Sequence, residues 1–290
     1  DPTVIKAKDN YFYLYATEDI RNVPIYKSKN LIDWDSVGTA FTKETRPRFE
    51  PKAGIWAPDI SYINGKYVLH YSMSVWGGEW TCGVGAATAD KPEGPFTDHG
   101  KLFQSNEIDV QNSIDPFYIE ENGKHYLFWG SFRGLYYVEL DNSALAVKAD
   151  SKPVRIAGTA FEGVYIHKRG KYYYMFGSIG TCCEGVKSTY SLVVGRSTSL
   201  FGPYVDKSGK DMLDNGYEVV IGNSDRFVGN EHCSEIVQDK NGADWIFYHG
   251  VDVKRPKGRV LLLDRVNWDK EGWPYVEGKK PSLTAPRPVF

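Results

Sequence analysis

The stretch EGVYIHKRGKYYYMFG, residues 162–177, decides the fold, because four other segments of the chain repeat its pattern. Each segment is a short apolar strand, a tight turn that carries Asn or Gly, and a second strand rich in aromatic residues. Asn and Gly suit such turns because they tolerate a positive φ. The related segments are DPTVIKAKDNYFYLYA (1–16), APDISYINGKYVLHYS (57–72), DPFYIEENGKHYLFWG (115–130) and, more loosely, CSEIVQDKNGADWIFYHG (233–250).

The spacing of these repeats predicts the architecture. Their turn residues lie about 58 residues apart on average, which leaves room in each unit for four short strands. A single four-stranded sheet cannot bury both of its faces, whereas five such sheets packed radially can. We therefore predict an all-β, five-bladed β-propeller with four-stranded blades, formed by residues 1–290 as a single domain. A β-sandwich with coincidental hairpins is the alternative.

Composition and charge argue against several classes of partner. The formal net charge is −2 and the charged residues are interspersed, so nothing favours nucleic acid or an anionic membrane surface. No apolar run is long enough to span a bilayer, and no stretch has the pattern of a signal peptide. The four cysteines form no C-x-x-C metal pattern and leave the redox compartment open.

Aligning the five repeats brings three carboxylates to one position, at the expected start of the first strand of a blade. They are Asp1, Asp115 and Glu162. The corresponding residues of the other two repeats are Ala57, with Asp59 two residues later, and Cys233, which follows His232. Because the first strand of every propeller blade lines the central channel, we expect the three acids to converge there. Two carboxyl groups, one protonated and one ionised, are what hydrolysis of a glycosidic bond needs, and a third can raise the pKa of the acid by like-charge repulsion.

Each acid taken alone also has a structural explanation. Asp-Pro, which occurs at Asp1 and at Asp115, commonly starts a turn, and Glu162 precedes a glycine. Turn chemistry does not, however, require an acid at the same position of blades that are not adjacent. The shared position therefore favours a catalytic interpretation, with residues 1–290 as one catalytic domain.

Aromatic and imidazole side chains near these positions suit a carbohydrate ligand. Trp56 and Trp76 offer flat apolar faces to a sugar ring, although core packing would also explain a tryptophan. His232 is expected at the channel end of blade five, either as a hydrogen-bonding residue or as a ligand. No second His or carboxylate at metal-ligand spacing accompanies it in the sequence.

With these motifs in place, the chain resembles glycoside hydrolase family 43 over essentially its whole length. The resemblance rests on the four hairpin segments DPTVIKAKDNYFYLYA, IWAPDISYINGKYVLHYS, SIDPFYIEENGKHYLFWGS and FEGVYIHKRGKYYYMFGS, and on the ending GRVLLLDRVNWDKEGWP. The segment SIGTCCEGVKSTYSLVVGRSTSLFGPY, residues 178–204, is similar to the corresponding segment of endo-arabinanases and their near relatives. Family members are five-bladed propellers that hydrolyse arabinose- and xylose-containing polysaccharides with inversion.

The resemblance implies a role for each candidate residue. Asp1 matches the general base, Glu162 the general acid, and Asp115 the residue that tunes the pKa of the acid and orients it. Trp56 and Asp59 match positions that shape the sugar pocket. His232 matches a histidine that faces a metal ion or a water cluster at the propeller axis. That ion is often calcium, whereas no cofactor is implied for the chemistry. The segment GNEHCSE departs from the family's usual Gly-x-Gly-His.

The resemblance also implies an activity and a setting. We expect an inverting glycoside hydrolase acting on arabinose-containing plant polysaccharide, either as an endo-1,5-α-L-arabinanase or as an α-L-arabinofuranosidase. We also expect a monomer that is exported to the periplasm or the extracellular space. A β-xylosidase or xylan-active member of the family, a non-catalytic carbohydrate-binding propeller and a protein-interaction propeller are the alternatives. The sequence decides neither between endo and exo action nor between arabinofuranosyl and xylosyl preference.

Overall fold

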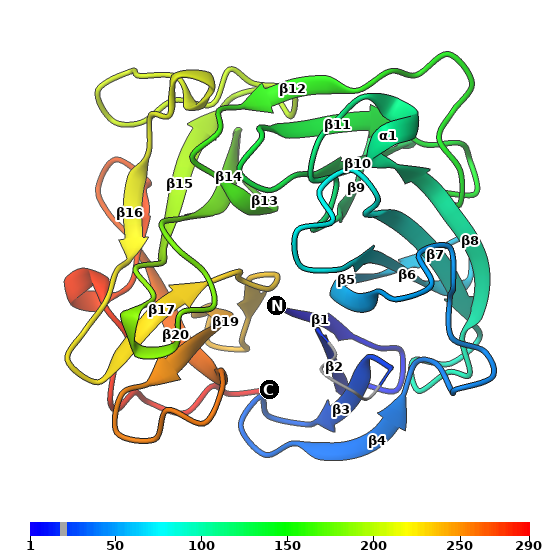
Figure 1. The fold of residues 1–290 in the computed structure, drawn as a ribbon. Coiled ribbons are helices and arrows are strands. Elements are labelled where there is room, and N and C mark those ends of the chain that lie inside the picture. Colours follow the sequence, from blue (N-terminus) through cyan, green and yellow to red (C-terminus); the bar gives the residue numbers. More distant parts are fainter. Residues whose placement is uncertain (18–21) are drawn as a thin grey trace. The chain divides into compact units, whose positions relative to one another are not determined.

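The computed structural model describes residues 1–17 and 22–290, which are almost entirely strands, turns and loops (Figure 1). The strands form five sheets. The helical elements of the described residues are short: α1 (Ser105–Ile108), η1 (Gly185–Lys187), η2 (Met212–Asp214) and η3 (Glu277–Lys279). The prediction of an all-β, five-bladed β-propeller with four-stranded blades is confirmed.

Each blade is built from strands that follow one another in the chain. Blade one contains β1 (Pro2–Lys6), β2 (Phe12–Ala16), β3 (Pro24–Ser28) and β4 (Asp35–Thr39). Blade two contains β5 (Gly54–Ile63), β6 (Lys66–Ser74), β7 (Gly83–Ala89) and β8 (Thr97–Gln104). Blade three contains β9 (Phe117–Glu121), β10 (Lys124–Trp129), β11 (Leu135–Glu139) and β12 (Val154–Ala157).

Blades four and five complete the fold. Blade four contains β13 (Glu162–Arg169), β14 (Tyr172–Ile179), β15 (Ser191–Ser197) and β16 (Glu218–Ile221). Blade five contains β17 (Phe227–Glu231), β18 (Val237–Gln238), β19 (Asp244–Asp252), β20 (Val260–Trp268) and β21 (Pro274–Tyr275). Both β17 and β18 pair with β19, so together they act as one interrupted first strand.

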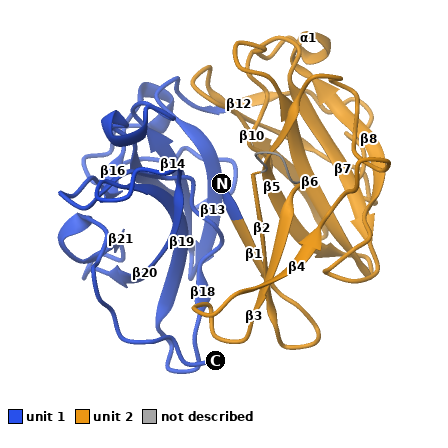
Figure 2. Cartoon of the chain, turned by 60° about the horizontal axis from the view of Figure 1, so that its bottom comes forward, with its two compact units in different colours: residues 1–2, 156–290 blue, residues 3–155 orange. Residues whose placement is uncertain are grey.

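The chain divides into two compact units, which Figure 2 colours separately. Unit 1 contains residues 1–2 and 156–290, and unit 2 contains residues 3–155. Unit 2 therefore holds nearly all of blades one to three, and unit 1 holds blades four and five. A single domain over residues 1–290 stays a prediction.

Two-residue turns join the first and second strands of blades two, three and four. In the turns Asn64–Gly65 and Asn122–Gly123 both residues have positive φ, as type I′ turns require. In the turn Gly170–Lys171 of blade four only the glycine has positive φ. The turn residues predicted from the sequence are thus found between paired strands in these blades.

The first strands of blades two and four each contain a bulge near their start. The pairs that flank the two bulges are Trp56 with Ser72, Asp59 with His70, Glu162 with Ser178, and Tyr165 with Phe176. In both blades three steps along the first strand match two steps along the second, so one extra residue lies on the first strand.

The strand pairing changes the predicted alignment of the acids. Phe117 in blade three is paired like Tyr165 in blade four, so the residue level with Asp115 is Gly163. Glu162 stands one residue earlier, because repeat matching aligned the turn glycines, and the glycine is the second turn residue in blade three but the first in blade four. The prediction that Glu162 shares the position of Asp115 was wrong by one residue.

Blade five requires the same kind of correction. Glu231 pairs with His249 in the way that Glu162 pairs with Ser178, so His232, and not Cys233, is level with Asp115. The residues that take this position in blades two to five all have positive φ: Ala57 (42°), Asp115 (62°), Gly163 (64°) and His232 (42°). A left-handed residue at the start of the first strand is therefore a shared feature of these four blades.

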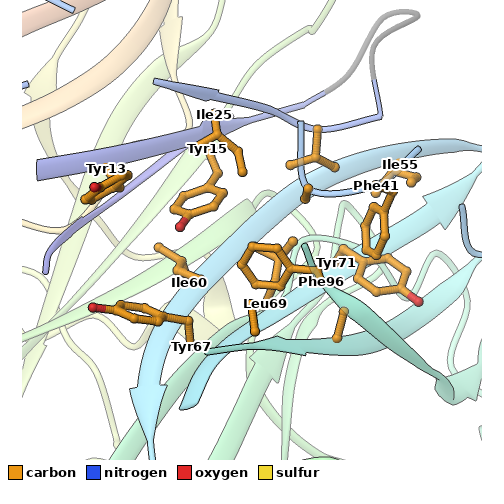
Figure 3. Packing of buried hydrophobic residues seen from close by; sticks show 14 of the residues in the cluster. Tyr13, Tyr15, Ile25, Phe41, Ile55, Ile60, Tyr67, Leu69, Tyr71 and Phe96 are labelled. Carbon is orange, nitrogen blue, oxygen red and sulfur yellow. The ribbon is translucent and has the colours of Figure 1, made fainter. Parts of the chain in front are cut away.

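Blades one and two share an aromatic core within unit 2 (Figure 3). The ring of Tyr71 lies edge-on to Phe41 with 5.6 Å between the centroids, and its hydroxyl donates to Asp98 at 2.6 Å. The hydroxyl of Tyr15 donates to the carbonyl of Pro92. Buried tyrosines supply a large apolar area while their hydroxyl groups stay hydrogen-bonded, so these two blades form a firm support for the strand ends described next.

Candidate active site

Hydrogen bonds from the preceding blade fix the backbone at the start of the first strands. The donor and acceptor pairs are the N–H of Ala57 with Thr17 Oγ1 (2.8 Å), the N–H of Asp115 with Ser72 Oγ (2.8 Å), and the N–H of His232 with Ser178 Oγ (3.0 Å). A left-handed backbone costs roughly 1–3 kcal/mol for a residue other than glycine. The three hydroxyl groups help to offset that cost, and they set the directions in which Asp115 and His232 project.

Two predicted carboxylates are buried in unit 2. Asp115 is 7% exposed and Asp59 is 5% exposed. The Oδ2 of Asp59 accepts the N–H of Tyr118 at 2.8 Å, three residues after Asp115. Asp59 thereby ties β5 to β9, and one of its oxygen atoms serves this structural bond.

The predicted tryptophans form an aromatic pair in the same unit. The rings of Trp56 and Trp76 lie 5.7 Å apart and are inclined at 49°. Trp76 is 78% exposed, which is unusual for a side chain with so large an apolar surface. An exposed aromatic face beside a second tryptophan is the kind of surface on which a sugar ring stacks.

The loop that carries Trp76 is tied down by Glu79. The Arg133 guanidinium donates to both carboxylate oxygens of Glu79, at 3.0 and 3.1 Å, in a bidentate pair. Gln111 donates to Glu79 Oε2 at 2.5 Å, and the N–H of Asn112 donates to the Glu79 carbonyl at 2.7 Å. The tryptophan loop of blade two is therefore held by residues of blade three.

Asp1 lies in unit 1 among basic side chains of blade five. Arg259 Nη1 donates to Asp1 Oδ1 at 3.0 Å, and Arg259 Nη2 donates to Oδ2 at 3.4 Å. His249 Nδ1 lies 2.9 Å from the main-chain nitrogen of Asp1, and His232 Nδ1 lies 3.5 Å from Asp1 Oδ1. A carboxylate paired with a guanidinium is in the ionised form that a base needs.

Glu162 begins β13, directly before a glycine that the site requires. Gly163 has φ 64°, and a Cβ at this position would lie 2.9 Å from His232 Nδ1. A side chain would therefore push against the imidazole as well as strain the backbone. The His232 ring therefore adjoins both Asp1 and Gly163, the residue that follows Glu162.

The side chains around His232 do not fit a calcium site. Among the residues that the structure describes, no three His, Cys, Asp or Glu side chains are grouped so that they could hold a metal ion. Calcium takes six to eight oxygen ligands, whereas His232 offers a nitrogen. Burial, together with the nearby Arg259 guanidinium, holds the pKa of His232 well below its ordinary value. His232 is thus a buried neutral imidazole, and we derive no catalytic step through a metal.

The sequence analysis missed three residues around Asp1, namely Glu231, His249 and Arg259. His249 stands in β19, where all nine residues are buried. His249 could have been singled out from the sequence as a histidine within an apolar strand, because buried polar groups need specific partners. The pairing of Asp1 with residues near position 250 joins the two ends of the chain, and no local pattern predicts it.

The predicted residues fall into two groups, one in each unit. Unit 1 brings together Asp1, His232 and the start of β13 with Glu162. Unit 2 brings together Trp56, Asp59, Trp76 and Asp115. Each unit therefore has carboxylates at the starts of its first strands, and the exposed tryptophan pair lies in unit 2.

Comparison with known proteins assigns this arrangement to a family. The sequence profile described as Glycosyl hydrolases family 43 matches residues 1–274. The extracellular exo-α-(1→5)-L-arabinofuranosidase ArbA of Cellvibrio japonicus is 32% identical, over 97% of this chain and 86% of that protein. The extracellular endo-α-(1→5)-L-arabinanase 1 of Bacillus subtilis is also 32% identical, over 94% of this chain and 86% of that protein.

Solved structures agree with the sequence relatives. The α-L-arabinanase of Cellvibrio cellulosa in complex with arabinohexaose superposes with a TM-score of 0.87 at 30% identity, covering 96% of this chain and 95% of the other. An exo-1,5-α-L-arabinanase from a bovine ruminal metagenomic library gives a TM-score of 0.81 at 33% identity, covering 95% of each chain.

A five-bladed propeller with carboxylates at the starts of its first strands, together with these relatives, defines a glycoside hydrolase. The chain belongs to glycosyl hydrolases family 43, and it hydrolyses glycosidic bonds. Among the described residues, none of the helices has the length and apolar character needed to cross a membrane.

Proposed function

We propose that this protein hydrolyses α-1,5-linked L-arabinan by a single displacement that inverts the anomeric carbon. The observation that carries the proposal is the unit 1 cluster in which Asp1, paired with Arg259, and the start of β13 both adjoin His232. Inversion requires a base and an acid that are far enough apart to leave room for a water molecule.

The mechanism assigns one proton transfer to each of two carboxyl groups. Glu162 donates its proton to the glycosidic oxygen, so that the C1–O bond breaks and the leaving sugar departs as an alcohol. Asp1 takes a proton from water, whose oxygen attacks C1 from the opposite face. To Asp115 we assign the role that the family resemblance implies, that of the residue which tunes and orients the acid. The side chains of the protein perform both transfers, so the reaction needs no cofactor.

The choice of arabinan rests on the relatives. The names of the proteins from Cellvibrio and Bacillus specify α-(1→5)-L-arabinan chemistry, one acting in the exo mode and one in the endo mode. We assign Trp56, Asp59 and Trp76 to substrate binding, with the exposed face of Trp76 stacking on an arabinofuranosyl ring away from the cleaved bond.

Replacing Trp76 by Ala is expected to raise KM for long arabino-oligosaccharides about tenfold, which corresponds to about 1.4 kcal/mol of binding. We expect kcat to change less than about twofold, because a residue away from the reacting atoms contributes uniform binding. Steady-state kinetics with oligosaccharides of increasing length measures both. The control is Leu283→Ala, which removes an equally exposed apolar side chain (75%). An unchanged KM for every chain length would show that Trp76 does not bind the substrate.

The test of the proposed function is hydrolysis of linear arabinan, branched arabinan and xylan, with analysis of product length and anomeric configuration. We expect the protein to release arabinose or arabino-oligosaccharides from linear arabinan, and the β-anomer of the new reducing sugar to form first. Short oligosaccharides of mixed length would indicate endo action, and a single small product exo action. Cleavage of xylan alone, or initial formation of the α-anomer, would contradict the proposal.

We further propose that the protein acts outside the cytoplasm as a monomer. Both curated relatives reported above are named extracellular. Size-exclusion chromatography with light scattering measures the oligomeric state, and a stable dimer would contradict the proposal that the protein is a monomer.

A further inference from the structure

His249 lies between Glu231 and Asp1 in unit 1. Its Nε2 is 2.8 Å from Glu231 Oε1, and its Nδ1 is 2.9 Å from the main-chain nitrogen of Asp1. Glu231 and His249 are both buried, and Glu231 directly precedes His232 in the segment GNEHCSE. A carboxylate this deeply buried needs a partner, and His249 is one.

The two contacts assign the tautomer of His249. The main-chain nitrogen of Asp1 carries hydrogen and can only donate, so Nδ1 must accept. A neutral imidazole that accepts at Nδ1 carries its proton on Nε2 and donates it to Glu231 Oε1. Burial, with the nearby Arg259 guanidinium, lowers the pKa of His249 well below its ordinary value, which is consistent with a neutral ring.

Arg259 lies beside both Asp1 and His249. Its Nη1 lies 3.0 Å from Asp1 Oδ1 and 3.2 Å from His249 Nε2. The guanidinium donates to Asp1 at 3.0 Å, which is shorter than its contact with Nε2. Nε2 donates to Glu231 Oε1 at 2.8 Å, which is the shorter of the two contacts of Nε2. Asp1 is therefore held twice, through its carboxylate by Arg259 and through its main chain by His249.

Without the carboxylate of Glu231, the Arg259 guanidinium, whose Nη1 lies 3.2 Å from Nε2 and can only donate, would favour an unprotonated Nε2 and a proton on Nδ1. In the other tautomer the N–H at Nδ1 would face the N–H of Asp1, so that two donors would oppose each other at 2.9 Å. In a buried site such a conflict is costly and would displace Asp1.

We propose that Glu231 is a positioning residue for the hydrolysis: by fixing the Nε2–H tautomer of His249, it locks the main chain of Asp1 at the distance from which the Asp1 carboxylate activates water. The inference rests on the proposed function, in which Asp1 is the general base. Glu231 does not itself touch the reacting atoms.

The first test is the Glu231→Leu variant, which keeps a similar volume and removes the acceptor. We expect kcat on arabinan to fall roughly 10- to 100-fold, because small misplacements of a reacting group cost this much. KM should change less than about twofold, since no sugar contact is lost. Glu231→Gln, whose carbonyl oxygen still accepts from Nε2, should recover most of the lost kcat.

The matched control is Asp264→Asn. Asp264 is also a buried carboxylate of blade five, and it accepts from Tyr248, the neighbour of His249. This variant should lose stability while its kcat stays close to that of the wild type. A fall in kcat as large as that of Glu231→Leu would show a general response of the blade and would overturn the proposal.

The second test is ¹⁵N NMR of the wild-type protein with labelled histidine, and it needs no variant to fold. We expect His249 to show a protonated Nε2 and an unprotonated Nδ1. A proton on Nδ1 overturns the proposal, as does wild-type kcat in a folded Glu231→Leu variant. An Asp1→Asn variant that stays active would instead overturn the proposed role of Asp1, so the two failures are distinguishable.

Discussion

Replacing Glu162 by Gln is expected to lower kcat on arabinan by about 10³-fold, equivalent to about 4 kcal/mol of transition-state stabilisation. The amide keeps the shape of the side chain but cannot protonate the glycosidic oxygen. Without that proton the sugar is a poor leaving group. An aryl arabinofuranoside with a strongly acidic phenol needs no such proton. Its turnover should fall far less, and the ratio of the two losses measures the acid role.

The control for this experiment is Glu218→Gln, which changes a carboxylate in the same blade. Glu218 accepts the N–H of Lys207 and lies in β16. Its variant should retain wild-type turnover on both substrates. Equal losses on arabinan and on the activated aryl glycoside would show that Glu162 does not act as the acid.

The Asp1→Asn variant should lose turnover on both kinds of substrate by about 10²- to 10⁴-fold. Water must be deprotonated whatever group leaves, so an activated leaving group cannot compensate for the missing base. The substitution also leaves the Arg259 guanidinium without its anionic partner. Parallel kinetics on arabinan and on the aryl glycoside provide the measurement.

The dependence on the leaving group separates the two roles. If Asp1→Asn behaved like Glu162→Gln, with activity retained on the aryl substrate, Asp1 would have no role as base. Thermal unfolding of both variants shows whether the blades remain intact. A folded Asp1→Asn protein with unchanged kcat would contradict the mechanism.

Most of the fold follows from local sequence because each blade begins with a hairpin. Turns such as Asn64–Gly65 combine residues that accept positive φ with flanking strands of apolar and aromatic residues. These signals lie within about 16 residues of chain, so a repeat of hairpins is visible without knowledge of the tertiary structure. The repeat then predicts the number of blades.

The details of the site were harder to predict from the sequence than the fold. Glycine is the second turn residue in blade three and the first in blade four, so matching the repeats by their glycines misaligned Glu162 with Asp115 by one residue. The partners of Asp1, Arg259 and His249, lie almost the whole chain away in sequence. Such contacts arise from closing the fold, so only the structure could reveal them.

The bulges also separate two demands on one strand. Beyond the bulge, β13 pairs residue by residue with β14 from Tyr165 to Arg169, whereas Glu162 lies before the bulge, outside this continuous register. A substitution at Glu162 can therefore change the chemistry of the protein without changing the paired part of the strand. A scaffold with this division can diverge in substrate while its core stays constant, and for this reason the starts of the first strands are where variation among relatives should be read as function.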